Sequence, residues 1–178
     1  MSQSSKSQIY LGIDVHKKSY SVTAFYDGSI VKTARMPASP KVLITFIRNF
    51  FPNQIINSVY EAGFSGLTLH RYLLRSGINN IVVHPASIEV ASNERAKTDK
   101  RDSKKMAIQL AAGRLKCIHI HSEQREHWRA ISRLRESFVK ERTRVGAKLK
   151  SLMFYFGLIP HDHVKRISRK WICALMKL

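Results

Sequence analysis

Acidic residues are scarce in this sequence, because 12 Asp and Glu stand against 31 Lys and Arg for a formal net charge of +19 over 178 residues. Such an excess of positive charge favours a polyanionic partner, nucleic acid before an anionic membrane surface. No run of about 18 uninterrupted apolar residues is present, which excludes a membrane-spanning helix. The two cysteines, Cys117 and Cys173, are too few and too far apart for a disulfide framework, and the polar start MSQSSKSQ carries no secretory signal. We therefore expect a reduced, cytoplasmic protein.

Hydrophobic residues make up 44% of the chain, which is enough for a core, and their spacing predicts an α/β domain. Asp27-Gly28 lies between two strand-like runs and predicts a hairpin. Ser39 and Pro40 are typical of a helix start, and Val42, Phe46, Asn49 and Phe50 outline the helix that follows. The predicted strands are 9–15, 19–26, 29–36, 55–63 and 79–85, and the predicted helices are 39–51, 65–77 and Thr98 to Gly113. Three strands as a meander, followed by alternating helices and strands, predict a mixed sheet with flanking helices, as in ribonuclease-H-like folds.

A long basic helix is predicted after this domain. Apolar residues recur there at alternating steps of three and four, and Arg135 and Arg142 occupy the positions that complete the heptads. A seam interrupted by arginine fits either a coiled-coil arm or a helix lying on a phosphate backbone. The apolar seam residues are Trp128, Ile131, Phe138, Val145, Leu149, Leu152 and Phe156. We expect a disordered tail at 1–8, the α/β domain at 9–116, the arm at 123–156 and the start of a truncated carboxy-terminal region at 160–178.

Four acids fall at positions where the predicted fold would bring them together. Asp14 ends the first strand, Glu61 ends the fourth, and Asp99 and Asp102 lie on one side at the start of a helix. Asp102, Met106 and Leu110 follow at four-residue steps, so the acids continue a stripe buried against the sheet. Converging carboxylates repel each other unless cations lie among them, and oxygen ligands suit Mg²⁺ or Mn²⁺. Two such ions about 4 Å apart stabilise the attacking and leaving oxygens of phosphodiester displacement.

Each of these acids also has a simpler interpretation. Asp99 and Asp102 in a first helical turn complement the helix dipole, and Glu61 suits a solvated strand end. Asp14 in GIDVHKKS would suit the phosphate loop of an actin-like ATPase, but such a loop needs glycine near the phosphate, and His16-Lys17-Lys18 supplies none. The joint occurrence of acid-bearing strand ends and an acidic helix tip on a basic chain favours the metal site. CIHIH, with Cys117, His119 and His121, is a weaker candidate for a soft-metal site, against an ordinary linker.

Basic residues surround these acids in excess of what ion pairing can absorb. Between residues 94 and 116, eight Lys and Arg accompany three acids, which favours contact with phosphates. Arginines on the arm are expected to contact a nucleic-acid backbone or an acidic partner surface. The candidate nucleic-acid-binding residues are Lys97, Lys100, Arg101, Lys104 and Lys105 near the acids, and Arg125, Arg129, Arg133, Arg135 and Arg142 on the arm.

Four stretches resemble the amino-terminal half of the DEDD transposases of insertion sequences, the IS-one-ten family that includes the invertase Piv. They are GIDVHKKSYSVTAF, YEAGFSGLTLHRYL, VVHPASIEVASNERAKTDKRDSKKMAIQLAAGRLK and RAISRLRESFVKERTRVGAKLKSLMFYFGL. The resemblance runs from about residue 9 to about residue 160, and TDKRD is its most specific piece. It implies that Asp14, Glu61, Asp99 and Asp102 are the metal-binding catalytic acids of a RuvC-like domain that requires Mg²⁺.

The same resemblance implies DNA recombination guided by a structured RNA, and oligomer assembly through the coiled-coil arm. Family members also carry a second, carboxy-terminal domain with a nucleophilic serine, whereas this sequence ends at Leu178 and offers no serine that matches it. We therefore expect a truncated or split transposase that is inactive alone. Two alternatives stay open, a non-catalytic nucleic-acid-binding remnant and a junction resolvase of the RuvC type.

Overall fold

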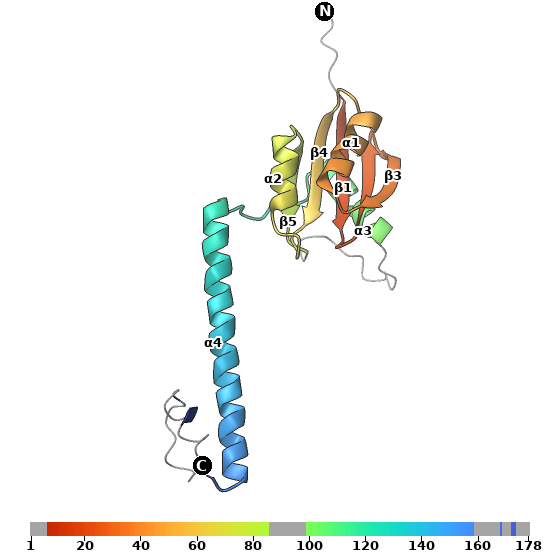
Figure 1. Ribbon diagram of the computed structural model, residues 1–178. Coiled ribbons are helices and arrows are strands. Elements are labelled where there is room, and N and C mark those ends of the chain that lie inside the picture. The colour runs from red at the N-terminus through yellow and green to blue at the C-terminus, as the bar shows by residue number, and fades with distance from the viewer. Residues whose placement is uncertain (1–6, 86–98, 159–167, 169–171, 174–178) are drawn as a thin grey trace, which may run out of the picture. The chain divides into compact units, whose positions relative to one another are not determined.

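The structure is a computed structural model that describes residues 7–85, 99–158, 168 and 172–173 (Figure 1). The chain divides into two compact units, Met1–Ile120 and His121–Leu178. The elements of the first unit are β1 (Gln8–Val15), β2 (Ser19–Tyr26), β3 (Ser29–Pro37), α1 (Pro40–Phe50), β4 (Ile55–Glu61), α2 (Thr68–Arg75), β5 (Asn79–Val83) and α3 (Asp99–Ala111). The second unit contains α4 (Glu123–Tyr155).

The five strands form one mixed sheet in the order β3-β2-β1-β4-β5. β1 pairs antiparallel with β2, and β2 with β3, whereas β1 pairs parallel with β4, and β4 with β5. Asp27 and Gly28 have φ values of 44° and 77°, as a two-residue hairpin turn with the twist of the sheet requires. The predicted meander and mixed sheet are confirmed, and this strand order with these directions is the ribonuclease-H-like, RuvC-like fold.

One face of the sheet is covered by α1 and α2 (Figure 1). Leu11 and Ile13 of β1 are fully buried there, because alternate residues of a strand point to the same face. The buried stripe of α1 differs from the outline expected from the sequence, since Val42 and Phe50 are 39% and 50% exposed. Phe50 lies at the rim instead, where its ring contacts Phe46 and the Lys32 ammonium. The residues of α1 that are buried are Leu43, Ile44 and Ile47.

The other face is covered by α3, which approaches β1 unusually closely. A Cβ atom at Gly12 would overlap the carbonyl oxygen of Ser103 and lie 2.6 Å from the amide nitrogen of Ala107. Ser103 is fully buried and shares a hydrogen bond of 2.8 Å with the hydroxyl of Thr23 in β2. Met106, 1% exposed, packs against β4 and β5. These contacts fix the position of the first turns of α3 over the centre of the sheet.

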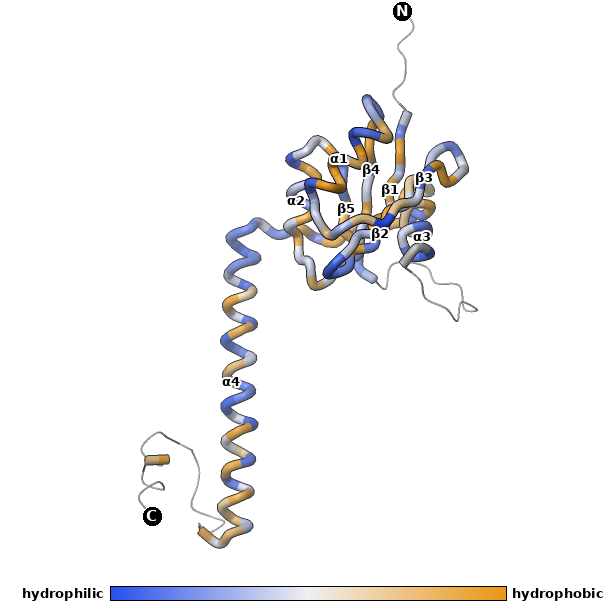
Figure 2. The backbone as a smooth tube through the Cα atoms, turned by 45° about the vertical axis from the view of Figure 1, so that its right-hand side comes forward, coloured by the Kyte–Doolittle hydropathy of each residue, from blue (hydrophilic) through white to orange (hydrophobic). Residues whose placement is uncertain are grey.

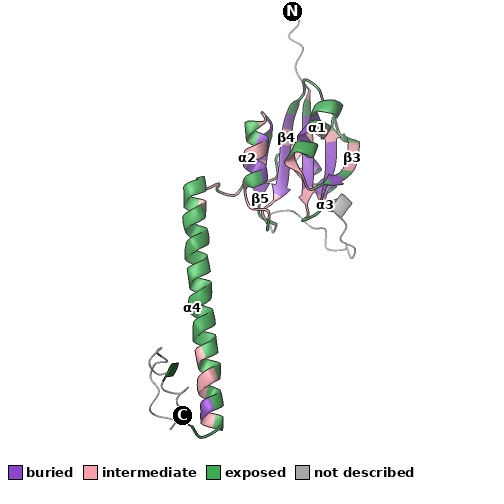
Figure 3. Cartoon of the chain, viewed as in Figure 1, coloured by how far each residue is buried: buried purple, intermediate pink, exposed green. Residues whose placement is uncertain are grey.

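The second unit is built on α4, a helix of 33 residues that extends over about 50 Å at 1.5 Å per residue. The helix expected at 123–156 is observed as Glu123–Tyr155, and the Ser122 hydroxyl caps its start by accepting from the amide of Arg125. Met153 is its one buried residue, and nearly all of the helix is exposed (Figure 3). Apolar and polar residues alternate along it (Figure 2). Within the described residues, no helix is both long and apolar enough to cross a membrane.

Candidate metal centre and nucleic-acid interface

Two of the predicted acids lie at neighbouring strand ends on the α3 face. β1 and β4 run parallel, and the last residues paired between them are Ile13 and Tyr60. Asp14 and Glu61 follow immediately on each strand, so the register places them side by side. Because side chains alternate along a strand, Asp14 shares the face of Gly12, which α3 covers.

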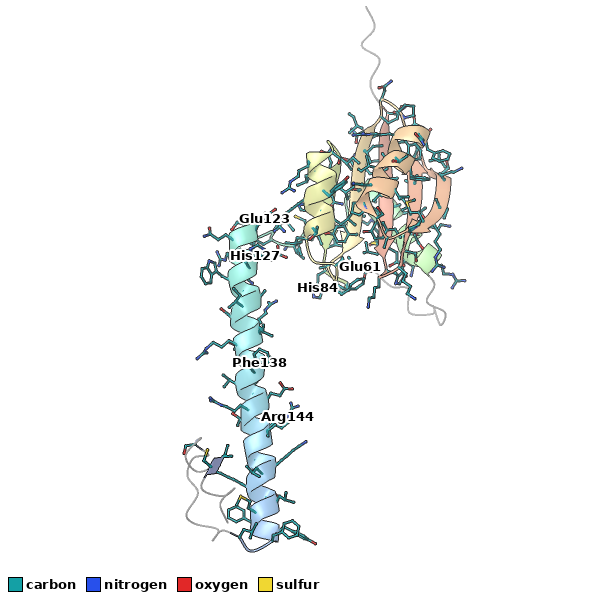
Figure 4. The ribbon with its side chains drawn as sticks, in the orientation of Figure 1. Glu61, His84, Glu123, His127, Phe138 and Arg144 are labelled. Atoms are coloured by element: carbon teal, nitrogen blue, oxygen red, sulfur yellow. The ribbon has the colours of Figure 1, made fainter. Side chains whose placement is uncertain are left out.

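The third acid comes from α3. Asp102 precedes the buried Ser103, and it is half-buried at the edge of the contact between α3 and the sheet. Asp14, Glu61 and Asp102 line one pocket of about 480 Å³, although they come from three elements far apart in the chain. Figure 4 labels Glu61 at this end of the sheet. Asp99 is the first residue of α3, and the structure describes its backbone but not its side chain. Thr98, the predicted N-cap, lies outside the described residues.

The carboxylate of Asp14 is held by a neighbour from its own strand end. Its Oδ2 atom accepts a hydrogen bond of 3.0 Å from Nε2 of His16, which also lines the pocket. The side chain of Asp14 is 18% exposed and that of His16 is 44% exposed. A carboxylate oriented by a second polar group is the arrangement that protein metal ligands usually show.

The donor set at this pocket fits a hard divalent cation, because all three described acids offer carboxylate oxygens. The three are not, however, arranged as a preformed coordination shell. Among the described side chains, no three of His, Cys, Asp or Glu lie close enough together to hold a metal ion. The same holds for the described residues of CIHIH, whose Cys117 instead forms an isolated bridge to Val83 at the edge of the sheet.

The basic residues predicted near the acids are only partly described. Lys97 lies outside the described residues, and Lys100 is described by its backbone alone. Arg101 and Lys104 are exposed on α3, whereas Lys105 is half-buried. The described part of this cluster therefore presents two exposed cations on the helix that carries Asp102.

The structure also brings to the pocket residues that were not predicted as part of the site. Phe64 follows β4, lines the pocket and is 71% exposed. Its loop is held by the buried Tyr60, whose hydroxyl donates to the carbonyl of Gly66 at 3.1 Å. Lys17 and Lys18 do not line the pocket, but they are exposed in the turn that follows β1, the strand that carries Asp14. Two sequence signals would have identified Phe64 and the lysine pair. One is an aromatic residue between glycines in GFSG, and the other is a pair of lysines after an acid-bearing strand.

The five arginines predicted on the arm are all exposed, but they lie in two different settings. Arg135 and Arg142 line an apolar groove of about 370 Å³ together with Ile131, Leu134 and Phe138. None of Arg125, Arg129 and Arg133 lines this groove. The seam arginines therefore lie among apolar side chains, and the other three face solvent on another side of the helix.

A family model described as transposase, for DEDD transposases of the IS110 type, matches residues 11–156. This chain belongs to that transposase family. It is 29% identical over 148 residues to the transposase for insertion sequence element IS1533 of Leptospira borgpetersenii, covering 79% of this chain and 43% of that protein. Against y4rJ of Sinorhizobium fredii it is 32% identical over 127 residues, covering 67% of this chain and 31% of that protein. The transposase chain described here thus spans less than half of the length of these relatives.

Among solved structures, that of RuvC from Thermus thermophilus is similar to the transposase domain at 10% sequence identity and a TM-score of 0.44. The likeness covers 62% of this chain and 99% of that one.

Proposed function

We propose that this transposase chain acts on phosphodiester bonds of DNA through a divalent-metal centre formed by Asp14, Glu61, Asp99 and Asp102. The observation that carries the proposal is that Asp14, Glu61 and Asp102 converge on one pocket from three separate elements. Asp99 lies one helical turn before Asp102 and completes the DEDD set. Mg²⁺ or Mn²⁺ bound there would supply charge stabilisation and activation of the attacking oxygen.

The residues around the acids hold the substrate and shape the site. His16 keeps the Asp14 carboxylate in one orientation. Lys17, Lys18, Arg101 and Lys104, with Lys97, Lys100 and Lys105, bind phosphates on either side of the scissile bond. Phe64 presents its ring to the pocket and stacks on an unpaired base next to that bond. The substrate strand is therefore engaged where it is locally unpaired, as a recombining junction is.

Three further features follow from the family resemblance and belong to the same proposal. Residues 9–116 form the catalytic DEDD domain, and α4 assembles copies of the chain through its seam, where Ile131, Phe138 and Val145 are each about 60% exposed. A structured guide RNA selects the DNA target. Full recombination also requires the serine-bearing domain that the family resemblance implies.

The test is a divalent-ion titration of the wild type and Asp102→Asn, followed by thermal unfolding. At about 100 times its Kd, Mg²⁺ is expected to stabilise the wild type by about 2.7 kcal/mol. Asp102→Asn is expected to lose most of this gain, while its stability in EDTA stays equal or rises because one of the mutually repelling carboxylates is removed. Asp27→Asn is the matched control, since Asp27 lies in the β2-β3 hairpin and its positive φ also suits asparagine.

Nicking of supercoiled DNA is measured on the same samples. Metal-dependent nicking that Asp102→Asn abolishes supports a catalytic centre, and stabilisation without nicking supports a metal-binding half that needs another domain. Cleavage of four-way DNA junctions by the wild-type chain alone would assign a resolvase in place of a transposase. A wild type that neither Mg²⁺ nor Mn²⁺ stabilises would overturn the proposed centre.

A further inference from the structure

The outer side of α4 carries a regular row of cations. The row is a basic strip whose members follow one another at steps of four, four, seven, four and four residues, which keeps them on one side of an α-helix. All six side chains are exposed. The basic strip consists of Arg125, Arg129, Arg133, Lys140, Arg144 and Lys148.

The strip keeps a net positive charge. Glu126, Glu136 and Glu141 lie at three- or four-residue steps from its members, which leaves an excess of three positive charges. Among the described residues, no ion pair engages any of the six cations. A helix side with this much uncompensated charge stabilises neither the helix nor a core, so its chemistry points to an external polyanion.

The strip is separate from the apolar seam of the same helix. Arg135 and Arg142 line the groove of about 370 Å³, and Arg142 lines a second groove of about 350 Å³ with Val145 and Leu149. None of the six strip residues lines either groove. Side chains project from α4 all round its axis, and Figure 4 labels Phe138 of the seam and Arg144 of the strip. The helix can therefore engage one partner through each side at the same time.

The length of the strip suits a duplex. From Arg125 to Lys148 the helix rises by about 34 Å at 1.5 Å per residue, which is about one turn of a nucleic-acid duplex. A straight helix holds its cations at fixed intervals, so it matches a stiff, regularly charged partner better than a flexible single strand.

We infer that the basic strip of α4 binds one turn of a nucleic-acid duplex along its phosphate backbone, while the seam stays available to a protein helix. This inference rests on the proposed function only in that the chain handles nucleic acid, and it is independent of the metal centre. It assigns Lys140, Arg144 and Lys148 to the interface and removes Arg135 and Arg142 from it.

The test measures how binding of the full chain depends on salt, in EDTA, by fluorescence anisotropy of a labelled 24-base-pair duplex. Each phosphate contact contributes about 0.9 to the slope of log K against log salt. Arg125→Gln/Arg129→Gln/Arg133→Gln is expected to lower that slope by up to about 2.7, and Lys140→Gln/Arg144→Gln/Lys148→Gln by a similar amount. The matched control, Arg135→Gln/Arg142→Gln, is expected to change the slope by less than about 0.5.

The outcomes separate the strip from its alternatives. Equal slopes for the wild type and both triple variants, or a control that lowers the slope as much as they do, would overturn the inference. Circular dichroism of each variant confirms that α4 is retained. If a triple variant loses helix, its three single Gln substitutions are measured in its place, each expected to lower the slope by up to about 0.9. DNA and RNA duplexes of one sequence identify the source of the backbone, whereas tighter binding of single strands with the same slope change would reject a duplex. Because EDTA removes divalent ions, failure of the metal proposal leaves this result unchanged.

Discussion

The sheet domain, which is the first unit of the chain (Met1–Ile120), and the helix α4 differ in what brings their proposed binding residues together. In the sheet domain the proposed site consists of residues that are distant in sequence, and strand register together with the packing of α3 brings them to one pocket at the ends of β1 and β4. In α4 the proposed binding surface follows from helical period alone, and one residue of its 33, Met153, is buried. The site in the domain therefore depends on tertiary packing, whereas the surfaces of the arm depend only on the helix remaining helical.

This difference predicts where substitutions are tolerated. A change at the contact between α3 and β1 should disturb both stability and the acidic pocket, because the same contact positions Asp102. A change on the arm should alter binding or assembly and leave the sheet intact. The predictions below test that separation, beginning with the largest expected effect.

Gly12→Ala is expected to lower the free energy of unfolding of the sheet domain by about 3 kcal/mol or more, because the new methyl group overlaps the backbone of Ser103. It should also abolish stabilisation by Mg²⁺. Gly63→Ala is the matched control, since the nearest atom to its new Cβ would be 3.9 Å away, and we expect little change. Urea denaturation gives both values, and similar stabilities of the two variants would show that α3 does not approach β1 as described.

Leu11→Ala is expected to cost about 3 kcal/mol, since Leu11 is fully buried in the sheet core. Phe138→Ala on the arm should cost less than about 0.5 kcal/mol, because that ring is 60% exposed in one copy of the chain. Hydrogen exchange of β1 and β4 at low protein concentration reports the sheet domain separately from α4. If Phe138→Ala lowered the protection of β1 as much as Leu11→Ala, the two units would unfold together and the comparison would fail.

Much of the sheet domain could be predicted from the sequence, because period-two alternation and turn residues are strong local signals. Asp14 and Glu61 were predicted at adjoining strand ends, and the sheet order confirms that placement. The inner face of α1 was less predictable, since apolar residues occur on two adjoining sides of that helix and only packing selects Leu43 and Ile47 over Val42.

The contact that positions α3 could not be predicted from hydropathy. It runs through Gly12, Ser103 and Ala107, which are small, and through the hydroxyl of Thr23, so none of these positions stands out as a core residue. The stripe from Met106 to Leu110 was predicted, and it packs beside Val59 as the second cluster of the domain. Small residues predict a close contact between a helix and a strand only when it is already known which helix packs on which strand.

Ser103→Ala is expected to cost about 1–2 kcal/mol, because it leaves the hydroxyl of Thr23 buried without a partner. Thr23→Val should cost a similar amount, and the double variant should cost less than the sum of the two. Thr143→Val on α4 removes an exposed hydroxyl that donates to the carbonyl of Val139 at 3.0 Å, so it serves as the control with almost no effect. Additive losses in the double variant would mean that the two buried hydroxyls are not coupled.

Phe64→Ala is expected to leave stability unchanged, since the side chain is 71% exposed, and to weaken binding of single-stranded DNA by about 1 kcal/mol in EDTA. Phe64→Tyr should restore affinity because it keeps an aromatic face, whereas Phe64→Leu should not, although leucine is also apolar. The readout is quenching of 2-aminopurine placed along the strand, which a stacked ring produces at one position only. Phe64 thus has in the sheet domain the exposure that is common on α4, and we propose base stacking as the reason that its ring lines an acidic pocket. If Phe64→Ala and Phe64→Tyr bound single-stranded DNA with equal affinity, the proposed stacking would be wrong. Phe64 would then be an exposed residue that tolerates substitution.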